Sequence, residues 1–244
     1  VYDTTKDSDG GTWRARADKV GSITKETLNT ATRGSRATHP QKWLIVARAA
    51  SVTIYDLDDA ACPMWTVFQT GTSNILLNVT DGSGAVTSVR AVNGILVVGL
   101  NQNGVRLVDF VGDTSLAVNS AGRYAFTGRL VNRNSQAVPY LAMSLDASVR
   151  IVNSTVNWVD AYLVAGTPID PIRKLPTPTV TVGTAGGASV IHYDGRVTNS
   201  SETTNFKTVA FGDGFLIMSA QSGYFGAQIS TFAEIQVNSF GGSS

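Results

Sequence analysis

The chain is short of charged residues, cysteine and long apolar runs, and each shortage excludes a class of protein. Only 15% of its 244 residues are charged, and the net charge of +1 gives no global field that would attract nucleic acid or an anionic membrane. The single cysteine, Cys62, excludes an intrachain disulfide and a zinc site built from thiolates. No run approaches the roughly 18 apolar residues of a membrane helix. We therefore expect neither nucleic-acid binding nor membrane insertion.

Residues that could carry catalysis are also scarce. His39 and His192 are the only histidines, and no G-x-S-x-G nucleophile motif accompanies them. The acidic runs Asp7–Asp9 and Asp56–Asp59 do not continue into the Gly and terminal Glu of an EF-hand loop. Turn capping by Asp side chains is the simpler explanation for both runs. The sequence therefore predicts a protein that is not an enzyme and that has no catalytic residues, no metal site and no cofactor.

What the sequence does contain is a repeated hairpin pattern. Each copy has an apolar strand, a turn of small residues and a second strand rich in β-forming residues. In the copies that begin at Pro40, Asn93 and Asp213 the first strand is continuously apolar, as expected for a strand that is buried on both faces. A fifth, weaker copy lies between Tyr140 and Ser154. The four clear copies are Pro40–Asp56, Asn93–Asp109, Thr177–Asp194 and Asp213–Ser230.

The glycines in these copies belong to hairpin turns rather than to a phosphate-binding loop. Gly99 and Gly104 do not follow the G-x-G-x-x-G spacing, and no Lys followed by Ser or Thr comes after them. No segment with helical periodicity follows that could offer its N-terminus to a phosphate. Glycine and Asn-Gly pairs supply the positive φ that a tight hairpin needs.

The repeats predict an all-β fold, either β-propeller-like or a related set of repeated antiparallel hairpins, with a polar irregular N-terminal arm. A propeller blade takes about 40–50 residues, so about five would fit. A β-sandwich is the alternative, because short strands at regular spacing give a similar pattern. Helix is scarce, and only Ser22–Ala31 could make one or two turns.

We expect four parts along the chain. Residues 1–38 form the polar arm, which is expected to order on docking to a partner, and residues 39–165 form a first group of blades. Residues 166–179 contain four of the seven prolines and read as a stiff connector. Residues 180–244 form the second group of blades.

The N-terminal arm contains the candidate interface. Trp13 lies in "GGTWRAR", between glycines and arginines, where either a docking contact or local packing is expected. The arginines of the arm would pair with carboxylates on a neighbouring protein. The candidate interface residues are Trp13, Arg14, Arg16, Arg33 and Arg36. The other tryptophans lie in apolar stretches and are predicted to belong to the core: Trp43, Trp65 and Trp158.

Longer blocks of the sequence carry a family resemblance. They are Tyr2–Arg14, Asn29–Pro40, Val52–Asp59, Pro63–Phe68, Val86–Phe110 and Pro176–Val197. Together they resemble tail-fibre-like virion structural proteins of tailed bacteriophages, especially those of marine and cyanobacterial hosts. The resemblance implies a propeller-like module that is often followed by a lectin-like domain. It also implies location in the virion tail, other tail proteins as partners, and a homo-oligomer in a symmetric assembly.

Three functions are compatible with these patterns. The first is a non-enzymatic structural component of a phage tail (a fibre, adaptor or nozzle-like protein) that contributes to virion assembly and host attachment. The second is a carbohydrate-binding module that recognises host surface glycans. The third is a polysaccharide-degrading tailspike, which would need two carboxylates in a cleft.

Overall fold

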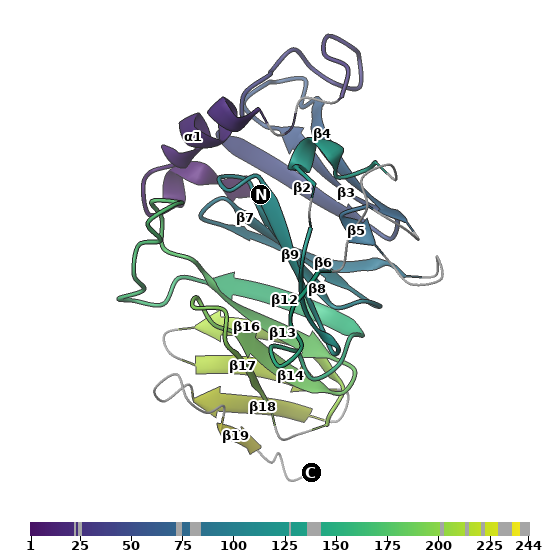
Figure 1. The fold of residues 1–244 in the computed structure, drawn as a ribbon, viewed down its shortest axis with the longest axis vertical. Helices are drawn as coiled ribbons and strands as arrows, with labels where there is room; N and C mark the ends of the chain where they lie inside the picture. The colour runs from purple at the N-terminus through teal and green to yellow at the C-terminus, as the bar shows by residue number, and fades with distance from the viewer. Residues whose placement is uncertain are drawn as a thin grey trace.

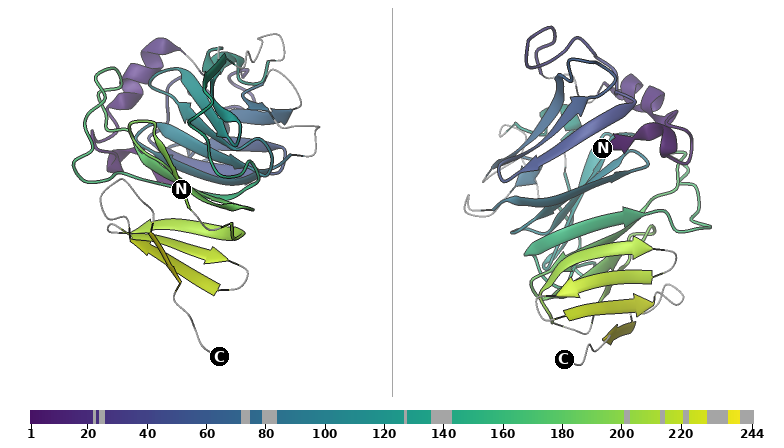
Figure 2. Two further views of the ribbon diagram at one scale, coloured as in Figure 1. Left: turned by 60° about the horizontal axis from the view of Figure 1, so that its bottom comes forward. Right: turned by 180° about the vertical axis from the view of Figure 1, so that it is seen from behind.

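Four antiparallel sheets follow one another along the chain and in space. The structure is a computed structural model that describes residues 1–21, 23, 26–71, 75–78, 84–126, 128–135, 143–200, 203–212, 215–220, 223–228 and 236–239. In Figures 1 and 2 the sheets lie in sequence order along the long axis of the molecule, with the first and fourth at opposite ends. The fold is all-β and propeller-like, as the repeated hairpins predict. The blades form an open row, because the last does not return to the first.

The strands of each sheet are consecutive in sequence. The first sheet contains β1 (Tyr2–Asp3), β2 (Lys42–Arg48), β3 (Ser51–Asp56), β4 (Met64–Gly71) and the short β5 (Leu77–Asn78), which is parallel to β4. The second contains β6 (Val86–Val92), β7 (Ile95–Leu100), β8 (Val105–Asp109), β9 (Thr114–Asn119), β10 (Gly122–Ala125) and β11 (Met143–Asp146). The third contains β12 (Val156–Tyr162), β13 (Thr179–Thr184), β14 (Gly187–Ile191) and β15 (Val197–Asn199). The fourth contains β16 (Phe206–Gly212), β17 (Phe215–Ala220), β18 (Gly223–Gln228) and β19 (Gln236–Ser239).

The second, third and fourth sheets are built on one repeated unit. The predicted hairpins become β7–β8, β13–β14 and β17–β18, the second and third strands of their sheets. In front of each hairpin lies a strand that the hairpin pattern did not include, namely β6, β12 and β16. These three strands share an irregularity near their start, between Val86 and Ser88, between Val156 and Trp158, and between Phe206 and Thr208. The first predicted hairpin is β2–β3.

The position of a sheet in the row determines whether its apolar strand is buried on both faces. All residues of β7 are buried, as predicted for its continuously apolar run, and all residues of β13 are buried as well, because both sheets have neighbours on both sides. The same prediction is wrong for the two end sheets. Leu44 and Val46 are only half-buried, and the side chain of Ile217 is 58% exposed. Each end sheet has a neighbouring sheet on one face only, so alternate side chains face outward.

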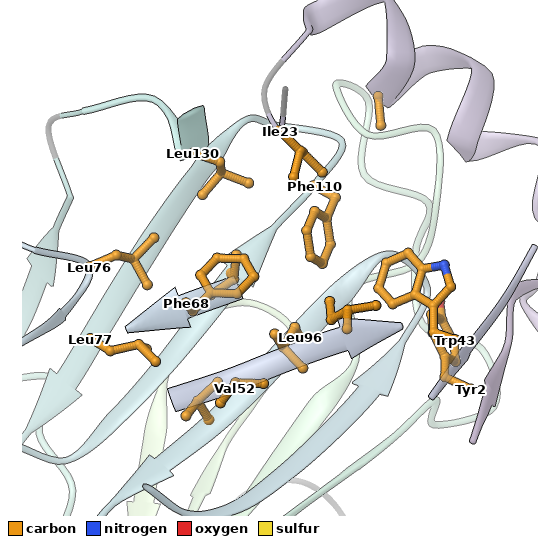
Figure 3. Close-up of a cluster of buried hydrophobic side chains, with 14 of the residues drawn as sticks. Tyr2, Ile23, Trp43, Val52, Phe68, Leu76, Leu77, Leu96, Phe110 and Leu130 are labelled. Atoms are coloured by element: carbon orange, nitrogen blue, oxygen red, sulfur yellow. The ribbon is translucent and has the colours of Figure 1, made fainter. Parts of the chain in front are cut away.

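Two hydrophobic cores hold the row together. The first lies between the first two sheets and is centred on aromatic rings; Trp43 and Phe110 meet edge to face with ring centroids 5.1 Å apart (Figure 3). The second lies between the second and third sheets and is aliphatic, with Val97, Val159 and Val182 among its members. Trp43 and Trp65 are 0% and 1% exposed, which confirms their assignment to the core.

Residues 1–20 of the expected irregular N-terminal arm contain regular structure, whereas residues 26–38 form no helix or strand. Strand β1 pairs with β2, a 3-10 turn follows at Thr4–Lys6, and α1 spans Trp13–Val20. Trp13 and Ala17 lie four residues apart on one face of α1, and both are fully buried. The segment is ordered because its few apolar side chains pack into the first core of its own chain.

The α-helix of the described residues therefore lies before the predicted position. Of the predicted helix Ser22–Ala31, residues 22, 24 and 25 lie outside the described residues, and residues 26–31 are not helical. Helix α1 ends instead at Gly21, whose φ of 64° gives the left-handed C-cap that glycine favours. No helix in the described part of the chain is long and apolar enough to cross a membrane.

The predicted division into blade groups also differs from the structure. Residues 166–179, expected to separate two groups of blades, join β12 to β13 within the third sheet. The fifth hairpin copy, Tyr140–Ser154, contributes β11, which pairs with β10; residues 147–154 form no strand, and residues 140–142 lie outside the described part. The prolines therefore lie in a long connection between two adjacent antiparallel strands of one sheet.

Candidate functional site

The sequence-predicted interface residues do not form one exposed surface. Trp13 is fully buried, and its ring stacks on Phe110 at 6.4 Å between centroids. Arg33 is 2% exposed, and its Nε and one terminal nitrogen have no hydrogen-bond partner. Burial lowers the pKa of Arg33, while the charge of Asp56 partly offsets this effect. The contacts of Trp13 are those of local packing, the second of its two expected roles.

The remaining predicted arginines are occupied by groups of the same chain. Arg16 forms an ion pair with Asp9 at 2.9 Å, and Arg36 pairs with Asp56 and lies 3.6 Å from Asp58. Arg14 donates to the carbonyl oxygens of Gly11 and His39. Arg14 and Arg36 both line a hollow of about 310 Å³ beside α1, together with Asp18, Thr38 and His39. Arg36 therefore already has carboxylate partners in its own chain, whereas the partners of Arg14 are carbonyl oxygens.

The acidic runs cap turns, as the sequence analysis expected. Asp9 accepts a hydrogen bond from the amide of Gly11 at 3.0 Å. Asp56 accepts from the amide of Asp58, and Asp59 accepts from the amide of Ala61, both at 2.9 Å. Each of these carboxylates therefore has a local structural task.

Asp7 has a different task, because it fixes the N-terminal segment to the turn of the β6–β7 hairpin. Its carboxylate accepts from the phenol of Tyr2, from Trp13 Nε1 at 2.7 Å and from the amide of Asn93 at 3.0 Å. Burial raises the pKa of Asp7, and these donors act in the opposite direction. Burial also raises the pKa of Tyr2. Two of the blocks that carry the family resemblance, Tyr2–Arg14 and Val86–Phe110, thus meet in one buried hydrogen-bonded network.

The conformation of the turn between β6 and β7 explains why Asn93 and Gly94 occupy it. Both have positive φ, 49° and 70°, as a type I′ hairpin turn requires. A Cβ on Gly94 would lie 3.0 Å from the indole of Trp13, so glycine is needed for space as well as for conformation. Arg173, in the connection between β12 and β13, donates to the carbonyl of Asn93 at 2.6 Å. The turn is a structural junction, and the question of a phosphate cradle does not arise there.

Both histidines are buried structural groups. His39 lies among Trp13, Trp43, Trp65 and Phe110, and its Nδ1 is 2.6 Å from Asp18 Oδ1. Burial lowers the pKa of His39, and the hydrogen bond to Asp18 acts in the opposite direction. Nε2 of His192 is 2.8 Å from Thr198 Oγ1 on the neighbouring strand. The blade-strand role expected for His192 agrees with this contact.

The surface that the sequence analysis missed is one face of β12. Trp158, predicted to be core, is 42% exposed, and Tyr162 on the same strand is 38% exposed. Asp160 lies between them and forms an ion pair with Arg90 of β6, with 3.2 Å between Arg90 Nε and Asp160 Oδ1. Alternate residues of a strand share a face, so these side chains form one row. We call Arg90, Trp158, Asp160 and Tyr162 the β12 row.

The signal for this row was present in the sequence "VNWVDAY". Val159 and Ala161 are buried, while Trp158 and Tyr162 alternate with them and have a carboxylate between them. An aspartate between two aromatic residues marks a face that is not buried, because an unpaired charge is costly in a core. Apolar neighbours along the chain obscured this alternation.

Comparisons with known proteins give no relative. No protein-family model matches the chain, and no curated protein matches it. The chain is similar in structure to the computationally designed Ika4 protein at 10% identity, with a TM-score of 0.29, covering 67% of this chain and 96% of that one. It is similar to the extracellular domain of the one-component system BT4673 from B. thetaiotaomicron at 13% identity, with a TM-score of 0.33, covering 81% of this chain and 28% of that one. It is also similar to BBS1N in complex with ARL6DN at 12% identity, with a TM-score of 0.28, covering 79% of this chain and 77% of that one. All three TM-scores are below 0.5, so these likenesses carry no conclusion about function.

Proposed function

We propose that this chain is a non-enzymatic structural component of a phage tail, a fibre, adaptor or nozzle-like protein that contributes to virion assembly and host attachment. The proposal starts from the sequence blocks that resemble tail-fibre-like virion proteins. The structural observation that supports it most is the direct packing of each sheet on the next in one open row. Such a row suits a spacer that transmits position from one neighbour to another.

The contacts between successive blades explain why the row would hold its shape. The amide of Val159 donates to Ser88 Oγ at 2.8 Å, which links β12 to β6. The amide of Phe211 donates to Asp160 Oδ2 at 3.0 Å, and Asn157 Nδ2 donates to the carbonyl of Phe206 at 2.8 Å. Side chains of one blade therefore satisfy backbone groups of the next, in addition to the apolar packing.

The open ends of the row are where neighbours would bind. The outer face of the first sheet carries the half-buried Leu44 and Val46, and the outer face of the fourth carries Ile217. In a closed propeller these faces would be covered by adjacent blades. Other tail proteins, or further copies of this chain in a symmetric assembly, are the partners that we propose for them.

Immunogold labelling of phage particles tests the assignment. Particles would be purified from a lysate that carries this coding sequence and labelled with antibodies raised against the isolated chain. We expect gold at the tail, with symmetric multiplicity, and peptides of the chain in the particle digest. Particles that infect normally but lack both the label and the peptides would refute the assignment.

A further inference from the structure

The β12 row presents aromatic and polar groups that the fold does not use. The indole N–H of Trp158 and the hydroxyl of Tyr162 have no hydrogen-bond partner within the described residues, and Trp158 has no ring partner there. The side chain of Arg90 is 56% exposed and uses its Nε to pair with Asp160. Two ring faces and several donors therefore meet solvent on one surface.

The repeated unit provides an internal comparison for these positions. The register aligns Val89, Val159 and Val209, which pair with Val98, Val182 and Met218 in their own sheets. With this alignment, the place of Trp158 is taken by Ser88 in β6 and by Thr208 in β16. The place of Tyr162 is taken by Val92 and Gly212. Blades of this unit therefore form without an aromatic residue at either place, and Ser88 shows that a small hydroxyl serves the junction.

Neighbouring groups hold the row in place. Phe211 of β16 stacks on Tyr162, with centroids 5.9 Å apart and an interplanar angle of 30°. Asp160 is fixed by the amide of Phe211 and by Arg90, so a carboxylate and a guanidinium both belong to the row. Trp158 and Tyr162 are four residues apart, so their Cα atoms are separated by about 13 Å along the strand. The row is thus an ordered strip about as long as several linked sugar rings.

We propose that the β12 row binds an oligosaccharide chain, with sugar rings on Trp158 and Tyr162 and hydroxyl groups on Arg90. The apolar face of a pyranose packs on an aromatic ring, and its equatorial hydroxyls accept from guanidinium and indole N–H donors. Arg90 and Asp160 neutralise each other, so the strip has no excess charge that would select a peptide of either sign. This inference rests on the attachment part of the proposed function, but it is measured on the isolated chain.

Tryptophan fluorescence makes the site directly observable. The chain has four tryptophans, and Trp13, Trp43 and Trp65 are 0%, 0% and 1% exposed. Trp158 is therefore the only one that acrylamide can readily quench. A ligand on the row would protect this fluorescence, whereas a ligand elsewhere on the surface would leave it unchanged.

The experiment screens the isolated chain on a printed array of neutral and uronic-acid-containing bacterial polysaccharide fragments, and then titrates each bound fragment in solution. The variants are Trp158→Thr and Tyr162→Val, which introduce residues found at the equivalent positions of other blades. The control is Ile172→Ser, because Ile172 is 82% exposed and lies in the connection between β12 and β13. We expect binding to weaken about tenfold in each row variant and to stay unchanged in the control. We also expect acrylamide quenching of the parent chain to fall when sugar binds.

The possible results are decisive for this site. No binding to any fragment, or equal binding by the row variants and the parent, would overturn the inference. Binding without protection of Trp158 would place the sugar elsewhere and overturn it too. Immunogold labelling of particles is independent of these results, so a tail protein without a sugar site and a sugar-binding protein absent from tails would be told apart.

Discussion

Replacing Trp13 by alanine tests whether the N-terminal segment is part of the core or a detachable arm. The side chain is fully buried, and truncation of a buried Trp costs about 3–5 kcal/mol through lost burial and the cavity left behind. The same change removes the donor that lies 2.7 Å from Asp7 Oδ2, so the cost lies toward the upper end of that range. For a domain of this size each kcal/mol lowers Tm by about 2–4 °C, so we expect a decrease of about 6–20 °C.

Urea and thermal unfolding, followed by near-ultraviolet circular dichroism, measure this cost. Trp13→Phe separates two contributions, since it keeps a ring in the core but removes the N–H that Asp7 accepts. Arg16→Ala is the surface control: its ion pair with Asp9 is partly exposed, and we expect a change of about 0–1 kcal/mol. If Trp13→Ala unfolds within 1 kcal/mol of the parent, in the manner of Arg16→Ala, the reasoning is wrong and the segment is an independent arm.

Three further outcomes follow from the same junction. A chain lacking residues 1–38 loses four members of the first core, so we expect the truncated protein to aggregate or bind a hydrophobic dye; a soluble product with native near-ultraviolet dichroism would contradict this. Gly94→Ala introduces a Cβ at φ 70° and 3.0 Å from an indole, so we expect about 2–4 kcal/mol of destabilisation in urea. The matched Gly166→Ala, at φ 81° with open space around it, should cost only about 1–2 kcal/mol; equal costs would exclude a steric role for Trp13. Because burial lowers the pKa of His39 in the folded state, the unfolded chain binds the proton more readily, and the free energy of unfolding should fall as pH drops below about 6.5. Urea midpoints between pH 7.5 and 5.5 measure this fall, which should be smaller in His39→Asn; an unchanged slope would remove His39 as its cause.

The sequence predicts the fold class because hairpin chemistry is local. An apolar strand, an Asn-Gly turn and a second strand are read within about 17 residues, and Asn103 and Gly104 in the turn between β7 and β8 both have positive φ. Strands β6, β12 and β16 escaped the pattern because none of them is continuously apolar. Thr87, Asn157 and Lys207 interrupt their apolar character.

Long-range contacts account for the other differences. The segment 1–38 is polar on average. Nothing in its own composition shows that Tyr2 and Trp13 pack into the core between the first two sheets, whose strands come later in the sequence. Burial on both faces depends on whether a sheet lies in the middle or at the end of the row, and hairpin copies look alike at both places. The β12 row is also invisible to local composition, because exposure there depends on which neighbour covers which face.

Asn93 joins the N-terminal segment to the connection between β12 and β13, and this has a consequence for the order of events during synthesis. Asn93 Nδ2 donates to Ser8 Oγ at 2.7 Å and to the carbonyl of Pro176 at 3.0 Å. Asn93 can therefore make both of these contacts only after residue 176 has been synthesised, 83 residues later in the chain. Completion of this junction is therefore a late folding event, because it waits for the connection that leads into β13.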